Sequence, residues 1–171
     1  MTSIQKNREL ALRTYEPRDI PRAVDLLMVA LPALPNYRMI TPDRERIEYV
    51  LTAGIDNAES FAGWVLCDTH NTVHGFSGGW CVRSLMSLDY VADDIFCWVE
   101  PEYRSYGNVR KLINAYAEWA TAKGAKLIRA SYSGGSFPPG SREAAAFDAI
   151  LKRQGFKNIG NIYHLSHYGE D

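Results

Sequence analysis

Hydrophobic and polar positions along the chain predict an alternation of strands and helices. Residues 10–15 alternate between apolar and polar side chains, which predicts a first strand. Apolar residues recur at helical spacing over residues 20–31, so we expect a helix that Asp19 caps and that Pro32 and Pro35 end. Helical spacing over residues 41–51 predicts a second, shorter helix.

The middle of the chain predicts a hairpin followed by a strand–helix–strand unit. Residues 61–67 and 73–82 are apolar runs separated by a polar turn, which is typical of an antiparallel hairpin. The continuous apolar run 95–99 indicates a central strand that is buried on both faces. A helix over residues 108–122 leads to a strand over residues 127–132, and strands joined in this way pair in parallel.

The last part of the chain predicts one more helix and two short strands. Ser141 begins a helix that Gly155 ends, and residues 156–159 and 162–165 are predicted as strands. The complete order favours an α/β protein (an α+β mixed sheet). In this fold, about six to seven strands form a central mixed sheet with helices on both faces.

Composition narrows the class of protein. Hydrophobic residues make up 46% of the chain and charged residues 23%, a globular balance, and 171 residues fit one domain over residues 1–171. We expect residues 1–8 of that domain to be flexible. The formal net charge of -1 does not indicate nucleic acid as a partner. No apolar run approaches the roughly 18 residues of a membrane helix, so no membrane partner is expected.

Three cysteines, Cys67, Cys81 and Cys97, lie in apolar stretches. Their odd number and their surroundings argue against a disulfide framework and fit a reducing compartment, so we expect a cytoplasmic location. No cysteine or histidine spacing is typical of a zinc site, so no metal is expected.

The segment after the central strand has the features of an anion site. The strand ends at Val99, and a helix starts near Asn108, where free N–H groups and the helix dipole favour a negative ligand. Gly107 lets a phosphate approach the backbone closely, and Arg104 can add a charge-assisted contact. An ordinary turn between strand and helix is the alternative, since neither GxxxxGK[ST] nor GxGxxG is present.

The same segment resembles the pyrophosphate loop of the GNAT superfamily of acetyltransferases, which reads Arg/Gln-x-x-Gly-x-Gly/Ala after V-x-P-x-x-R. Residues 99–109 match this pattern except that Val109 replaces the last small residue. The family's late motif, a helix ending in Gly-Phe, has its counterpart in residues 152–156, and the order of elements also agrees. Residues 94–99 and 117–120 resemble compact phage and bacterial N-acetyltransferases.

The resemblance implies acetyl-coenzyme A as co-substrate. Backbone amides from Arg104 to Val109 would hold its pyrophosphate, and the backbone of residues 97–99 would pair with the pantetheine arm. The coenzyme contacts predicted in this way are Cys97, Trp98, Val99, Arg104, Ser105, Tyr106, Gly107, Asn108 and Val109.

Direct transfer to an amine needs a base that removes a proton and an acid that protonates the leaving thiolate. Asp93 stands where several family members carry a catalytic glutamate, so we expect it to be the base, with Asp94 next; solvated surface acids are the alternative. Adjacent strand residues face opposite ways, so only one of them should reach the site. The family's usual tyrosine acid falls near Leu151, which makes Tyr132, followed by Tyr163, the substitute.

A covalent route through Cys97 is disfavoured, because a buried thiol without a neighbouring histidine stays inert. Surface or strand packing is expected for His70, His74, His164 and His167, with His164 as a spare base. The acceptor should approach from the side built by residues 32–45, 83–93 and 133–142. The side chains predicted to meet it are Tyr37, Trp80, Arg83 and Tyr90.

The sequence therefore predicts an acyl-CoA-dependent N-acyltransferase that moves acetyl to a primary amine, either a small molecule or a protein amine. Two alternatives stay open: a coenzyme A-binding regulatory or host-interaction protein of the same fold without catalysis, and a phage-type modifier of nucleic acid or protein. Whether the protein forms a homodimer is equally open.

Overall fold

One five-stranded sheet forms the centre of the computed structural model, which describes residues 9–34, 37, 40–130 and 140–159. Its strands lie in the order β1-β2-β3-β4-β5, and all neighbours are antiparallel except β4 and β5, which are parallel. The strands are β1 (Ala11–Thr14), β2 (Phe61–Cys67), β3 (Val73–Arg83), β4 (Tyr90–Val99) and β5 (Ala125–Arg129). The predicted hairpin is confirmed, and so is the parallel direction of β4 and β5. The pairing uses residues 90–93 of β4, however, and not the predicted run 95–99, of which only Val99 is buried.

The predicted mixed sheet is confirmed, but the described residues contribute five strands to it, fewer than the six or seven expected. Residues 156–159 lie beyond the last helix and form no strand. The other predicted short strand, residues 162–165, lies outside the described residues.

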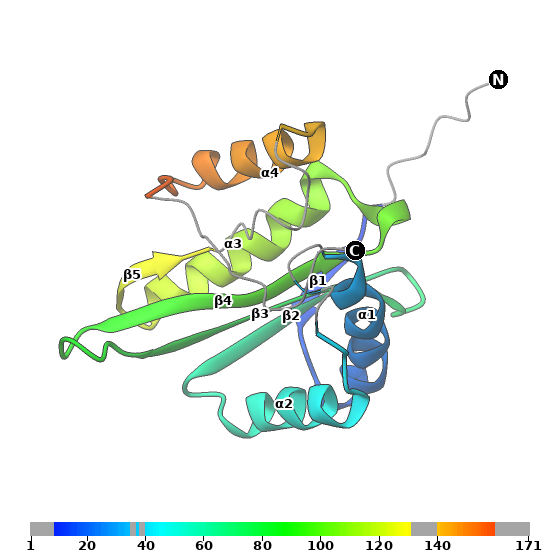
Figure 1. Ribbon diagram of the computed structural model, residues 1–171, viewed down its shortest axis with the longest axis horizontal. Coiled ribbons are helices and arrows are strands. Elements are labelled where there is room, and N and C mark those ends of the chain that lie inside the picture. Colours follow the sequence, from blue (N-terminus) through cyan, green and yellow to red (C-terminus); the bar gives the residue numbers. More distant parts are fainter. Residues whose placement is uncertain (1–8, 35–36, 38–39, 131–139, 160–171) are drawn as a thin grey trace.

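Helices cover both faces of the sheet (Figure 1). Helices α1 (Ile20–Ala33) and α2 (Arg44–Asp56) pack on one face, around a core that includes Phe61, Val65 and Phe76. Helix α3 (Tyr106–Ala122) packs on the other face against Trp64 and Leu66, and α4 (Arg142–Arg153) lies on its outer side. Two short 3-10 turns, η1 (Pro17–Asp19) and η3 (Pro101–Tyr103), precede α1 and α3.

Local sequence explains where most helices begin. The side chains of Asp43, Ser105 and Ser141 each accept a hydrogen bond from the backbone N–H three residues later, at the start of α2, α3 and α4. Asp19 is the N-cap residue of α1, as expected, but its side chain makes no capping hydrogen bond to the helix and instead accepts two hydrogen bonds from Arg13, at 2.6 and 2.8 Å. Helix α1 ends at Ala33, between the two prolines expected to end it.

A β-bulge in β4 changes which side chains face which side of the sheet. Gly78 pairs with Phe96, but the next residue of β3, Gly79, pairs with Asp94, so Ile95 is the extra residue. The pairing of β4 with β5 ends at Asp93, opposite Arg129. Among the described residues, the edge of β4 from residue 94 to 99 therefore has no strand beside it.

Candidate functional site

The open edge of β4 lines a cavity of about 330 Å³ between the two helical layers. Helices α1 and α2 form one wall, and the beginning of α3 with one residue of α4 forms the other. The residues that line it are Leu27, Ala30, Leu31, Leu34, Tyr37, Arg46, Ile47, Val50, Leu51, Asp94, Ile95, Phe96, Cys97, Trp98, Val99, Arg104, Val109 and Phe147.

The first turn of α3 presents backbone donors beside this cavity. Ser105 is the N-cap residue, and its hydroxyl accepts a hydrogen bond from the Asn108 amide at 3.1 Å. The amides of Ser105, Tyr106 and Gly107 donate to no acceptor in the described part of the chain. A Cβ atom added at Gly107 would have only the Ser105 hydroxyl within 4 Å, at 3.9 Å, so the space over this turn is open. These amides and the helix dipole make the turn an anion-binding site.

Two further arginines add positive charge to the same turn. The guanidinium carbons of Arg153 and Arg110 lie 5.2 and 5.9 Å from the centre of the Tyr106 ring. The hydrogen bond from Arg153 is the largest of the influences that lower the pKa of the Tyr106 hydroxyl. A ligand that carries negative charge at the start of α3 would meet favourable electrostatics.

The predicted coenzyme residues Asn108 and Val109 have different surroundings. The Asn108 side chain is buried; its amide donates to the Tyr103 carbonyl at 2.8 Å, and its oxygen accepts from the Leu10 amide at 3.2 Å. This side chain therefore holds the turn in place. Val109 already lies within α3, where its amide donates to the Ser105 carbonyl, and its side chain lines the cavity.

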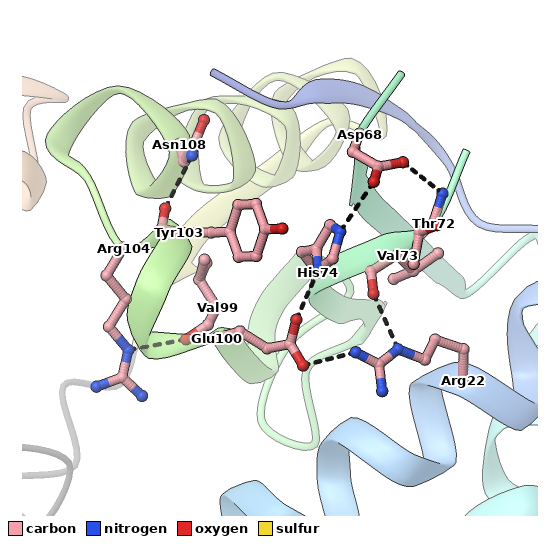
Figure 2. Close-up of polar contacts among 10 residues, drawn as sticks. All are labelled: Arg22, Asp68, Thr72, Val73, His74, Val99, Glu100, Tyr103, Arg104 and Asn108. Atoms are coloured by element: carbon pink, nitrogen blue, oxygen red, sulfur yellow. Dashed lines mark hydrogen bonds and ion pairs between the residues drawn. The ribbon is translucent and has the colours of Figure 1, made fainter. Parts of the chain in front are cut away.

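Arg104 lies where the open edge of β4 meets the turn (Figure 2). Its Nε donates to the Val99 carbonyl at 2.8 Å, and its guanidinium lies 4.2 Å from the centre of the Trp98 ring. Burial lowers the pKa of this guanidinium, which pairs with no carboxylate at salt-bridge distance among the described residues. The Val99 carbonyl is consequently already occupied, so a ligand pairing with this edge would use the backbone before it.

A partly buried polar network around the buried His74 fixes the end of β4 (Figure 2). Nδ1 of His74 lies 2.6 Å from Oε2 of Glu100, and Nε2 lies 3.3 Å from Oδ2 of Asp68. Arg22 of α1 binds the other oxygen of Glu100 at 2.6 Å, and the His74 ring stacks on Tyr103 with centroids 3.9 Å apart. The network joins β3, β4, α1 and η3, the turn that leads into α3.

The sequence did not predict this network around His74. Sequence reasoning expected ordinary packing for His74, because its acidic partners lie 6 and 26 residues away along the chain. His70 is exposed in the turn between β2 and β3, as expected for a surface residue. His164 and His167 lie outside the described residues.

The bulge at Ile95 separates the two candidate bases. Because Gly75, Ser77 and Gly79 alternate along β3, their partners Val99, Cys97 and Asp94 share one face of β4. Asp94 lines the cavity. Asp93 faces the opposite way and pairs with Arg129 of β5, at 2.6 Å between Oδ1 and Nε. The structure thus brings Asp94 to the site, and it holds Asp93, the residue favoured from the sequence, in an ion pair outside it.

Cys97 lines the cavity as an inert thiol. Burial, and after it the charge of Asp94, raise the pKa of Cys97 to about 12, although a hydrogen bond with Ser77 acts in the opposite direction. At neutral pH the group is almost entirely protonated, and no described histidine is paired with it.

The predicted acid and acceptor residues are only partly brought to the cavity. Tyr132 and Tyr163 lie outside the described residues, and Leu151, at the family's usual tyrosine position, is buried between α3 and α4. Of the predicted acceptor contacts, Tyr37 lines the cavity. Trp80, Arg83 and Tyr90 lie instead on the β3–β4 hairpin, which extends beyond the helices in Figure 1.

Sequence patterns did not predict most of the cavity wall that α1 and α2 form. Helical spacing predicts that the apolar residues of these helices belong to the core, and this spacing does not distinguish a cavity wall from a core. Within the described ranges, no three His, Cys, Asp or Glu side chains are placed to hold a metal ion. No helix in the described part of the chain is both long and apolar enough to cross a membrane.

Solved acetyltransferases share this fold. An acetyltransferase of Trypanosoma brucei has a TM-score of 0.64 and 18% identity, over 92% of this chain and 99% of its own. An aminoglycoside acetyltransferase from an uncultured soil metagenomic sample, solved with sisomicin, has a TM-score of 0.63 and 19% identity, over 92% and 96% of the two chains. AAC(6')-Iy, solved with the bisubstrate analog CoA-S-monomethyl-acetylneamine, has a TM-score of 0.66 and 16% identity, over 94% and 99%.

No protein-family model matches the sequence, and no curated protein sequence matches it either. The likeness therefore lies in the fold. The chain has the fold of the GNAT-type acetyltransferases, which confirms the resemblance found in its sequence at the level of structure.

Proposed function

We propose that the protein is an N-acetyltransferase that moves the acetyl group of acetyl-CoA directly to a primary amine. The observation that carries this proposal is that three features lie next to one another. The open edge of β4 after Asp93 and the carboxylate of Asp94 line the cavity, and the first amides of α3, which donate to no described acceptor, lie beside it between Arg104 and Val109. An extended pantetheine arm can add to an open strand edge, and its pyrophosphate suits the helix start.

On this proposal the amides of Ser105, Tyr106 and Gly107 bind the pyrophosphate, and Arg104 adds a charge at the same place. The backbone of Cys97 and Trp98 pairs with the pantetheine arm. The Asn108 side chain and the His74–Glu100 pair take no part in binding and keep the turn in position. AAC(6')-Iy, a protein of the same fold, was solved with a bisubstrate analog that contains CoA, which supports coenzyme A as the ligand.

The transfer step is a direct attack of the neutral amine nitrogen on the thioester carbonyl carbon. A C–N bond forms, the C–S bond breaks, and coenzyme A leaves as the thiolate. We assign Asp94 as the group that accepts the amine proton, since its side chain lines the cavity and that of Asp93 does not. Tyr132 stays the predicted acid for the thiolate.

The proposal is tested by adding acetyl-CoA alone and then with a panel of amines. Acetyl-CoA should raise the melting temperature, and at least one amine should cause release of free coenzyme A. Binding without release by any amine would favour the second candidate, a coenzyme A-binding protein without catalysis. The leucine at position 151, where the family's usual acid would stand, favours that candidate.

The two carboxylates provide the test of the base. Asp94→Asn should lower kcat at least about tenfold and leave the KM for acetyl-CoA within a factor of about two. Asp93→Asn is the matched control, since it removes the same charge from the neighbouring residue and breaks only the pair with Arg129. A larger loss of kcat in Asp93→Asn than in Asp94→Asn would reverse the assignment.

A further inference from the structure

The wall that α1 and α2 contribute to the cavity, together with Leu34 and Tyr37 between them, is almost entirely apolar. Its side chains are Leu27, Ala30, Leu31, Leu34, Tyr37, Arg46, Ile47, Val50 and Leu51. In the described part of the chain, only three charged side chains line the whole cavity, namely Arg46, Asp94 and Arg104. Two are cations and one is an anion, and they stand among apolar neighbours.

Arg44 and Arg46 are both exposed residues of α2, but among the described residues only Arg44 has an acidic partner. Arg44 forms an ion pair with Asp25 of α1. Arg46 forms no ion pair with any described residue, and its guanidinium lies over the Tyr49 ring, 5.0 Å from the ring centre. A guanidinium in this state offers a fork of N–H donors to a carboxylate that enters the cavity.

The charges of the cavity also limit what can enter it. Aminoglycosides, the class of compound that some proteins of this fold act on, carry several ammonium groups. Binding such a polycation would require several carboxylates along the wall, whereas the described lining has Asp94 alone and places Arg46 among the apolar side chains. Juxtaposed like charges disfavour a ligand, so this wall selects against polycations.

We propose that the acceptor is an amine with an apolar body and one carboxylate, and that Arg46 binds that carboxylate. This inference rests on the proposed function, since it names the acceptor of the same site. The apolar body packs against the α1 and α2 wall, and the amine lies toward Asp94 and the thioester. Arg104 is on the coenzyme side of the cavity, which leaves Arg46 as the cation available to the acceptor.

The test compares pairs of acceptors that differ in the carboxylate alone. Rates of coenzyme A release are measured with 6-aminohexanoate against pentylamine, with L-phenylalanine against phenethylamine, and with sisomicin. In at least one pair the carboxylate acceptor should have a kcat/KM about tenfold higher or more, because a site built for a charged group rejects the analogue that lacks it. Sisomicin should be the poorest acceptor.

Arg46→Gln should bring the ratio within each pair close to one and leave the KM for acetyl-CoA unchanged, and Arg46→Lys should restore part of the preference. Arg44→Gln is the matched control, because it removes a guanidinium from the same turn of α2 without touching the cavity. A preference that survives in Arg46→Gln, or sisomicin as the best acceptor, would overturn the proposal.

Failure of the proposed function gives a different result. If acetyl-CoA binds but no amine releases coenzyme A, the transfer activity is refuted, and acceptor specificity is then read from binding. Calorimetric titration of the coenzyme A complex with N-acetylphenylalanine and N-acetylphenethylamine should show tighter binding of the carboxylate, and Arg46→Gln should abolish the difference. Equal binding of the two compounds to the unaltered protein would refute the role of Arg46.

Discussion

The two sides of the cavity are built from opposite kinds of contact. On the side where β4 leads into α3, charged and polar groups satisfy one another: His74 lies between Glu100 and Asp68, and Asn108 binds backbone on two segments. On the side of α1 and α2, side chains such as Leu27 and Leu51 pack without hydrogen bonds.

The polar side of the cavity therefore has a fixed geometry, whereas the apolar side has a shape that can select a ligand. Hydrogen bonds have directional requirements, so a network of them holds backbone amides in one arrangement, as a phosphate site needs. Apolar packing is less directional, so a wall of leucine, isoleucine and valine can change its shape by substitution while the fold is kept. The coenzyme side is thus expected to tolerate little change, and the acceptor side more.

The largest effect should come from bulk and negative charge at the start of α3. Gly107→Glu places a carboxylate where the amides would bind phosphate, so acetyl-CoA affinity should fall about a hundredfold or more, measured by calorimetric titration. Thr121→Glu adds the same charge at the far end of α3 and should leave affinity unchanged. Equal affinities of the two variants for acetyl-CoA would show that the coenzyme does not bind at the start of α3.

The next effect concerns the stability of the apolar wall. Leu51 is 1% exposed, and Leu51→Ala should lower the free energy of unfolding by about 3 kcal/mol, because it removes buried methyl groups and enlarges the cavity. Val50→Ala alters the same wall at a side chain that is 39% exposed and should cost below about 1 kcal/mol. Urea unfolding measures both, and equal losses would show that the wall is not continuous with the core.

Breaking the polar network should cost somewhat less. Glu100→Gln leaves Arg22 and His74 facing a neutral amide, so the free energy of unfolding should fall by about 2 kcal/mol, discounted for the partial exposure of Arg22. Asp25→Asn breaks the surface pair with Arg44 and should cost less than about 1 kcal/mol. If the two variants unfold at the same urea concentration, the network is no stronger than a surface ion pair.

The smallest effect is expected between the two sides, at Cys97. Its pKa of about 12 leaves only about one thiol in ten thousand ionised at pH 8, so a covalent route through this residue is disfavoured. Cys97→Ala should therefore change kcat less than about threefold, measured by coenzyme A release. A loss as large as that of Asp94→Asn would instead indicate an acyl-cysteine intermediate.

Much of the fold could be predicted from the sequence because its signals are local. The caps at Asp43, Ser105 and Ser141 act within a single helical turn, and the strand–helix–strand unit follows from apolar runs and their lengths. The open turn at Gly107 is also a local property, since it depends on a missing side chain and on the first amides of α3.

The tertiary structure alone decided which residues meet at the cavity. Asp94 lines the cavity and Asp93 does not because of the bulge at Ile95. One extra residue in a strand moves the side chains before it to the opposite face of the sheet. The pairing of His74 with Glu100 spans 26 residues. Sequence patterns record the period of a segment and not its partners, so they determined the elements and the helix start, and packing determined the walls of the site.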